Sequence, residues 1–495
     1  MQVSQRRRDG CTECRRKKVK VASSLSIKAW KALTNYCLQC DLQKPVCTRC
    51  QRYPKGCIYN LSVVGQGVEP RPARQQLSAS RIGVAVDRQD QLSIIKSLEA
   101  LANQPSLHFS PALSSEQSRF FMHIFATETA PRLFPAAPDL FLQRMISASL
   151  QTPHLLYALL AAACSHHSRL VQDASPSSKI ACLKFTNLAI SSLRSTIGES
   201  SQRLSTETVA TAMALCTNDV CNGNMHVWRT HLSGVRQLLN AFLAQERSRW
   251  VQDSYIHSLV KWFTTLNLIA SLSGQSHTAF ASEAAQEPLN DILGQSSGYI
   301  DDVCGYSLEL VPCLTQVSHL IQQQRMTAST SDDMPQDELV LQQSQLLENE
   351  LFLLLDSTVS DVTMKSKGEL ALELQHTHRA FVHTALLHLH RRVQKLPISH
   401  PKVRADIAGI IRAIQDIRPF SAANILILWP VFSAGCETGS SSERSIIQGR
   451  MANMQSLGMG NFTRARELLN LFWASGTPLQ WDAFFAQLGL ELVLF

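Results

Sequence analysis

Residues 6–20 read RRRDGCTECRRKKVK and residues 40–60 read CDLQKPVCTRCQRYPKGCIYN, with a segment of 19 residues (21–39) between them. Outside that segment the stretch holds six cysteines: Cys11, Cys14, Cys40, Cys47, Cys50 and Cys57. Two residues separate Cys11 from Cys14, and two separate Cys47 from Cys50. Six residues lie between Cys40 and Cys47, and six lie between Cys50 and Cys57. A short turn lets paired thiolates face one ion, and soft thiolates select zinc over magnesium or calcium. The spacing therefore predicts a zinc-binding module.

This stretch resembles the fungal Zn2Cys6 binuclear cluster, a DNA-binding module of transcription regulators. The resemblance implies two zinc ions, with Cys11 and Cys47 bridging both. Cys14 and Cys40 would then complete the coordination of one ion, and Cys50 and Cys57 that of the other. Pro45 matches the proline of the family between the two halves of the module.

The same resemblance assigns DNA contacts to the basic run after the second cysteine, which comprises Arg15, Arg16, Lys17, Lys18 and Lys20. Lys17 and Lys18 would contact bases, favouring guanine through its O6 and N7 acceptors within a CGG-like half-site. The other three would hold phosphates, which sets affinity and salt dependence but little specificity. Double-stranded DNA is thus the expected partner, together with the transcription machinery.

Segment 21–39 interrupts the module. The family has its third cysteine six residues after the second, where this chain has Val21. Without the segment, CTECRRKKVKCDLQKPVC fits the family pattern with no gap. One hypothesis is that the segment is the translation of a retained intron, because its length keeps the reading frame. Valine codons begin with GT and glutamine can be encoded by CAG, which match the two splice-site ends of an intron. Leu33-Thr34-Asn35 can encode a branch site just upstream of the second end. The alternative is a genuine loop insertion, in which Cys37 could offer a substitute ligand. Either way, we expect the chain as written to bind zinc and specific DNA weakly, and deletion of the segment to restore both.

Charge is concentrated at the start of the chain. Residues 1–60 carry 14 Lys and Arg against 3 Asp and Glu, whereas the remaining residues carry 33 against 36. A short basic head on a near-neutral body indicates a polyanionic partner. The basic residues at 6–8 and 15–20 also suit a nuclear import signal. No apolar run approaches the ~18 residues of a membrane span, so no membrane partner is expected. The cysteines after residue 60 are scattered, which predicts free thiols in a reducing compartment.

The chain divides into three parts on composition: the cluster at 1–60, a linker at 61–105 and a helical body at 106–495. The linker is rich in Gly, Pro, Gln and Ser, with one short helix expected at 91–102. Its heptads are not sustained, so a homodimer through this linker is unsupported and dimerisation stays open. The fold class expected is mainly α, with a small N-terminal zinc cluster and a large all-helical regulatory domain.

Apolar periodicity predicts the helices of the body. A buried helix should begin at Pro153 after Thr152, and Trp228 to Phe242 should form an amphipathic helix. Further helices are expected at 370–393, 401–417 and 422–432, the last ended or kinked at Trp429-Pro430, with a polar break at 322–336. The body resembles the second fungal-specific transcription factor domain over about 106–490. Four segments carry this resemblance: LLYALLAAACSHHSRL (155–170), WRTHLSGVRQLL (228–239), ILWPVFSAGCE (427–437) and GNFTRARELLNLFWAS (460–475).

A helical interaction protein whose disrupted cluster makes no specific DNA contact is the principal alternative. An enzyme is not expected, because no convergent catalytic set or HExxH, GxSxG or P-loop string is present. The histidines at 376, 378, 383, 388 and 390 have no i,i+4 pair, so we expect a solvated or partly packed helix there, not a metal site. His166 and His167 should make cap or core contacts, Cys436 lacks a partner for nucleophilic catalysis, and the turn at 458–460 should precede a helix.

Overall fold

The structure is a computed structural model. It describes residues 20–21, 39–40, 110–198, 204–223, 228–245, 253–274, 299–327, 334–356, 369–490, 492 and 494–495. The chain forms two compact units, Met1–Glu99 and Ala100–Phe495. In the first unit, the described residues form two short parallel strands, β1 (Lys20–Val21) and β2 (Gln39–Cys40). The predicted linker and its short helix lie outside the described residues.

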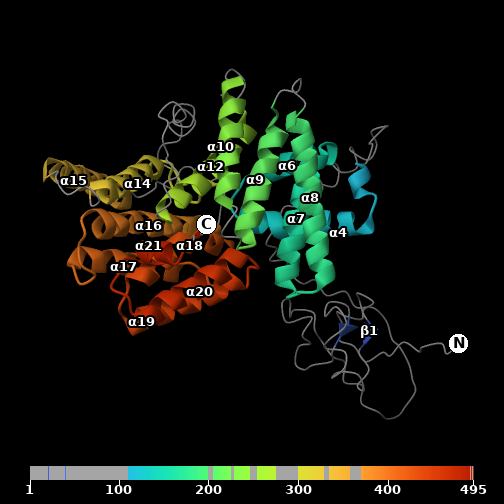
Figure 1. Ribbon diagram of the computed structural model, residues 1–495. Coiled ribbons are helices and arrows are strands. Elements are labelled where there is room, and N and C mark those ends of the chain that lie inside the picture. Colours follow the sequence, from blue (N-terminus) through green and yellow to red (C-terminus); the bar gives the residue numbers. More distant parts are fainter. Residues whose placement is uncertain are drawn as a thin grey trace, which may run out of the picture. The chain divides into compact units, whose positions relative to one another are not determined.

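The second unit is helical, as predicted (Figure 1), and its first half surrounds one hydrophobic cluster. Phe125, Trp228 and Phe263 are among its large, fully buried side chains. The elements of this half are η3 (Pro111–Leu113), α4 (Glu116–Ile124), η4 (Phe125–Thr129), α5 (Ala130–Leu133), α6 (Asp139–Gln151), α7 (Pro153–Leu170), α8 (Pro176–Gly198), α9 (Thr206–Cys221), α10 (Trp228–Gln245) and α12 (Ser254–Leu272).

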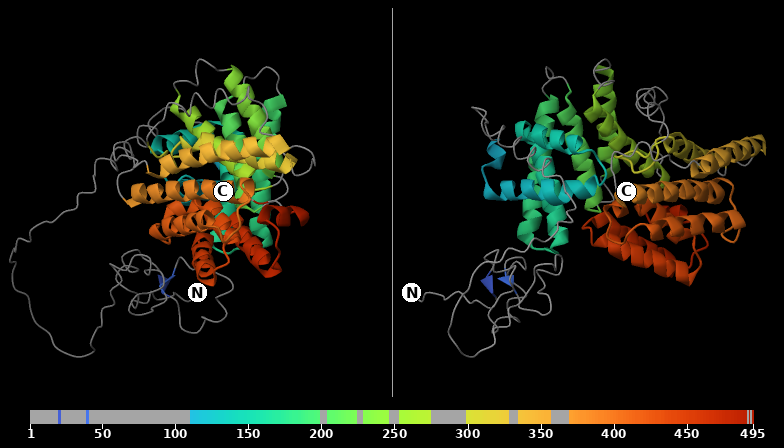
Figure 2. Two further views of the ribbon diagram at one scale, coloured as in Figure 1. Left: turned by 90° about the vertical axis from the view of Figure 1, so that its left-hand side faces the viewer. Right: turned by 180° about the vertical axis from the view of Figure 1, so that it is seen from behind.

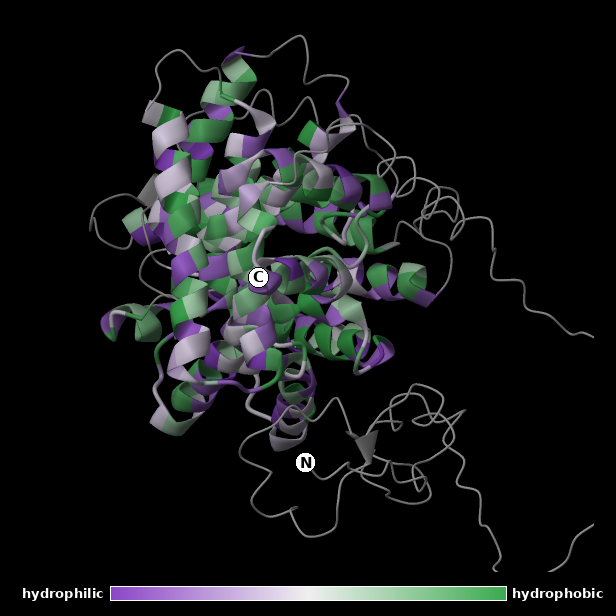
Figure 3. Cartoon of the chain, turned by 90° about the vertical axis from the view of Figure 1, so that its right-hand side faces the viewer, coloured by the Kyte–Doolittle hydropathy of each residue, from purple (hydrophilic) through white to green (hydrophobic). Residues whose placement is uncertain are grey.

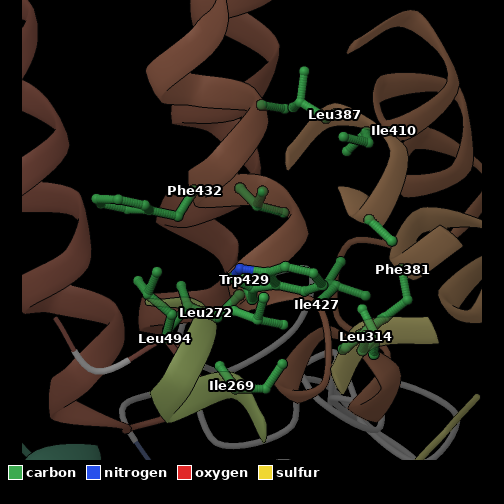
Figure 4. Packing of buried hydrophobic residues seen from close by; sticks show 14 of the residues in the cluster. Ile269, Leu272, Leu314, Phe381, Leu387, Ile410, Ile427, Trp429, Phe432 and Leu494 are labelled. Carbon is green, nitrogen blue, oxygen red and sulfur yellow. The ribbon is translucent and has the colours of Figure 1, made fainter. Parts of the chain in front are cut away.

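The second half surrounds another cluster, which packs around Trp429, Phe381 and Phe432 (Figure 4). Its elements are α14 (Leu310–Thr327), α15 (Met334–Asp356), α16 (Glu369–His388), η6 (Leu389–Val393), α17 (Pro401–Asp416), η7 (Ala422–Ile425), α18 (Leu428–Glu437), α19 (Ser441–Gln455), α20 (Gly460–Ser475) and α21 (Trp481–Gln487). In Figures 1 and 2, α14 and α15 lie along one edge of this half, and α19 and α20 along the opposite edge.

Figure 3 shows hydrophilic residues in purple and hydrophobic residues in green, interspersed along the helices of the body. In α10 the buried residues are Trp228, Leu232, Val235, Leu239, Phe242 and Leu243, so the predicted amphipathic stripe is confirmed. The buried helix predicted from Pro153 is also confirmed as α7. Thr152 occupies its N-cap position but makes no side-chain cap hydrogen bond. The helices predicted at 370–393 and 401–417 correspond to α16 with η6 and to α17.

Two predictions about helix ends were wrong. The segment 422–432 is not one helix that ends at Pro430: a 3-10 turn, η7, comes first, and Pro430 lies in the first turn of α18. First-turn residues have no intrahelical partner for their N–H, so proline is tolerated there. The polar break predicted at 322–336 is shorter, because α14 continues to Thr327 and α15 begins at Met334.

Candidate functional sites

Most of the predicted DNA-binding cluster lies outside the described residues. This holds for Cys11, Cys14, Cys47, Cys50 and Cys57, and for Arg15, Arg16, Lys17 and Lys18. Of the predicted site, the structure describes the backbone of Lys20 in β1 and of Cys40 in β2. The zinc ligands and the DNA contacts therefore stay predictions.

The strand pair fixes one feature of the interrupted module. Lys20 pairs with Gln39 and Val21 pairs with Cys40, in parallel register. Neighbouring strands lie about 4.8 Å apart. The two ends of segment 21–39 thus lie side by side, and the backbone of Cys40 lies next to Val21, the position where the family pattern places its third cysteine.

The body holds a buried network of charged and polar side chains around Asp482 at the start of α21. Asp482 accepts hydrogen bonds from Arg325 at 2.5 Å and from Arg392 at 2.8 Å. Burial alone would raise the pKa of Asp482, but the two guanidinium groups outweigh it and hold this pKa at about 2. Arg392 also donates to Nδ1 of His388, whose Nε2 lies 3.0 Å from the Ser433 hydroxyl. Burial lowers the pKa of His388, so it stays neutral and accepts this bond.

A second network joins η6 to α15 and α17. The buried His390 has Nδ1 at 2.6 Å from Asp406 and Nε2 at 3.2 Å from Glu348. Glu348 also pairs with Lys402 at 2.7 Å. The expectation of a solvated or partly packed helix is therefore wrong for His378, His388 and His390, which are buried. Sequence reasoning missed this because their partners come from other helices. Among the described residues, no group of side chains converges on a possible metal position.

The free thiols predicted after residue 60 and the core contact predicted for His166 are confirmed. The seven cysteines of the helical body are free thiols, five of them buried. Burial raises the pKa of Cys436, so its thiol stays protonated. His166 makes the expected core contact, with Nδ1 at 3.0 Å from Thr129 and Nε2 at 2.9 Å from the Leu457 carbonyl oxygen.

Sequence reasoning missed a cavity that lies where the two hydrophobic clusters meet. Its volume is about 90 Å³, and its lining comes from α5, α9, α12, α16, η7, α20 and the last residues of the chain. Gly460 helps to form it: a Cβ here would lie 2.8 Å from the Cys221 carbonyl oxygen at the end of α9. Glycine thus lets α20 approach α9, which places Asn461 and Phe462 in the cavity wall.

Among the described residues, no helix has the length and apolar character needed to cross a membrane. A family model, the fungal specific transcription factor domain, matches residues 119–495. The chain therefore belongs to this family, as the resemblance over 106–490 implied, and is a transcription regulator of a generally non-enzymatic class. Searches of curated proteins and of solved structures returned no match.

Proposed function

We propose that this chain is a zinc-dependent, sequence-specific DNA-binding regulator of RNA polymerase II transcription, acting in the nucleus on CGG-like half-sites. One observation carries the proposal: a family body at 119–495 follows a basic stretch with six cysteines at metal-ligand spacing. Zinc binding supplies ~10 kcal/mol or more in zinc-finger peptides, enough to order a small module that lacks a large core. The body would recruit or restrain the transcription machinery.

The proposed division of labour between bases and phosphates can be tested one side chain at a time. Lys18→Ala should cost ~1–3 kcal/mol on a CGG duplex and relax sequence preference, because it removes a base contact. Arg16→Ala should weaken binding to all duplexes alike and reduce the salt slope by about 1, because it removes a phosphate contact. All substitutions are made in the variant that lacks residues 21–39, where specific binding is expected. Lys96→Ala, which lies in the predicted linker, is the matched control and should change neither. Fluorescence anisotropy with CGG and scrambled duplexes at two salt concentrations measures all three.

Segment 21–39 has a calculable effect on the module. It lengthens the gap between Cys14 and Cys40 from 6 to 25 residues. Loop closure costs about 0.6 kcal/mol for each doubling of loop length, so this change costs about 1.2 kcal/mol, or roughly 8-fold in affinity. The adjacent ends in β1 and β2 support a loop that leaves and returns at one place. Deleting 21–39 should tighten zinc binding by at least this factor and restore specific DNA binding.

The alternative function, a helical interaction protein without specific DNA contact, predicts a different outcome. In that case the chain as written, with segment 21–39 present, would select no sequence from a random DNA pool in a gel shift at fixed salt. Sequencing the spliced message across codons 15 to 45 decides between a retained intron and a genuine loop. A homodimer is the proposed assembly on palindromic sites, and sedimentation of the full chain with and without DNA tests it.

A further inference from the structure

The cavity at the junction of the two clusters has room for more than water. Its volume of about 90 Å³ is several times the ~10–15 Å³ that one water molecule needs and of the same order as the ~150 Å³ of an engineered cavity that binds benzene. Its wall is mainly apolar and includes Trp262, Phe381 and Phe462, and no charged side chain lines it. A neutral, compact ligand therefore matches its size and chemistry.

Two oxygen atoms in the wall lack partners within the described part of the chain. They are Oγ1 of Thr217 on α9 and Oδ1 of Asn461 on α20, and their residues are 7% and 2% exposed. The amide nitrogen of Asn461 donates to the carbonyl oxygen of Phe495, so only half of this carboxamide is satisfied. Buried polar atoms in folded proteins nearly always have a partner. Oδ1 of Asn461 can accept a hydrogen bond, and the Thr217 hydroxyl can donate one as well as accept one.

We propose that this cavity binds a small, neutral, mainly apolar molecule that carries a hydroxyl group, which donates to Oδ1 of Asn461 and accepts from the Thr217 hydroxyl. The hydrocarbon part of the ligand would replace empty space between aromatic rings. The ligand would touch both clusters, because the wall contains Val220 and Trp262 from one and Phe381 and Phe462 from the other. Its binding would thus stabilise the whole body by mass action, whether or not the head binds DNA.

Phenol and toluene are matched probes that differ in the hydroxyl. On the full chain, phenol should raise the thermal midpoint and bind about 10-fold more tightly than toluene by ligand-observed NMR, because one hydrogen bond is worth about that factor. Thr217→Val should weaken this preference, because the phenol hydroxyl then keeps Asn461 as its one remaining partner, and should leave toluene binding unchanged. Thr264→Val is the control: its hydroxyl is also buried and unpartnered but lies outside the cavity wall, so the preference should persist. Equal affinity of the wild type for both probes, or binding of neither, would overturn the proposal.

A second, independent observation concerns two thiols between α7 and α8. The sulfur of Cys182 lies 2.8 Å from that of Cys164, closer than two sulfurs in ordinary van der Waals contact. Cys164 is fully buried, whereas Cys182 is half-buried. The hydrogen bond with Cys164 lowers the pKa of Cys182 to about 7 against the effect of burial, and Ser165 and Arg169 add to this. Cys182 is therefore the nucleophile of the pair.

We infer that a hydroperoxide converts this pair into a reversible disulfide. The Cys182 thiolate attacks one peroxide oxygen, the O–O bond breaks, and an alcohol or water leaves as Cys182 becomes a sulfenic acid. The Cys164 sulfur then attacks the Cys182 sulfur, the S–O bond breaks, and the departing hydroxide takes the Cys164 proton to form water. Two thiols are oxidised, the peroxide is reduced, and α7 is covalently joined to α8.

This inference can be tested by treating the full chain with hydrogen peroxide. The remaining thiols are then alkylated and the peptides are mapped by mass spectrometry. The wild type should yield a Cys164–Cys182 linked peptide that a dithiol reductant removes. Cys164→Ser should instead leave a sulfenic acid on Cys182 that dimedone traps, and Cys182→Ser should yield neither product. Cys313→Ser is the control and should behave as the wild type. A linked peptide that forms no faster than oxidation of Cys313 would overturn the inference.

Discussion

Replacing Asp482 with alanine should be among the most destabilising single changes in the body. The carboxylate is 4% exposed and neutralises Arg325 and Arg392, and Arg392 is itself 5% exposed. Removing one partner of a buried ion pair costs ~3–5 kcal/mol, because the remaining charge is left without compensation. Asp482→Ala should lower the free energy of unfolding by this amount. Asp482→Asn keeps the shape and one acceptor oxygen, so it should cost about 2 kcal/mol.

The matched control is Glu467→Ala, which removes an exposed ion pair with Arg464 at 3.0 Å. Exposed pairs contribute less than ~1 kcal/mol, so this variant should differ little from the wild type. Urea unfolding of the full chain, followed by far-UV circular dichroism, compares the midpoints. If Asp482→Ala lowered the free energy of unfolding no more than Glu467→Ala does, the conclusion that the buried ion pairs of Asp482 stabilise the body would be refuted.

The pH dependence gives a second test of the same network. The pKa of Asp482 is about 2 in the folded chain and about 3.9 in an unfolded one. A lowered pKa means that the stabilisation is present above pH ~4 and is lost as the pH falls towards ~2. Linkage gives about 2–3 kcal/mol for the full effect. The difference in stability between the wild type and Asp482→Asn should therefore shrink over this pH range, and a constant difference would contradict the assignment.

Four further changes test separate parts of the body. Burial lowers the pKa of His166 to about 4. The free energy of unfolding of the wild type should therefore fall by up to about 3 kcal/mol as the pH falls from ~6.5 to ~4. Unfolding measured across this pH range should show a smaller fall in His166→Gln. Trp429→Ala should cost ~3–5 kcal/mol in urea unfolding, since this ring is fully buried at the centre of Figure 4. Gly449→Ala should raise the thermal midpoint by the equivalent of ~0.5–1 kcal/mol, because the new Cβ would have no atom within 4 Å. Gly409→Ala should lower the thermal midpoint, because the new Cβ would lie 2.5 Å from the His383 ring.

The helices that the sequence predicted well are of two kinds. In one kind the apolar residues recur on a single face of the helix, and in the other nearly the whole helix is apolar. Trp228 to Phe242 and Pro153 onward are confirmed because burial of apolar residues follows directly from their helical spacing. Helix ends were harder: Pro430 breaks a helix interior but fits a first turn, and only the tertiary structure decides which of these applies. The resemblance of the body to its family is likewise confirmed over 119–495.

Sequence reasoning did not identify the cavity or the polar networks. Thr217 and Asn461 lie more than 240 residues apart, and each is a single polar residue with no periodic signal. His390 lies beside Asp406 and Glu348, which come from different helices, so its burial could not be predicted from local spacing. Such sites depend on which helices pack together, and local periodicity does not determine that packing.

The most direct test of the proposed regulator is the zinc content of the full chain and of the variant lacking residues 21–39, each purified with and without Cys47→Ser. The account predicts two zinc ions per chain in the deletion variant, weaker zinc binding in the chain as written, and loss of the two-ion complex when Cys47 is replaced. A deletion variant that holds no zinc, or one whose zinc content is unaffected by Cys47→Ser, would contradict the account.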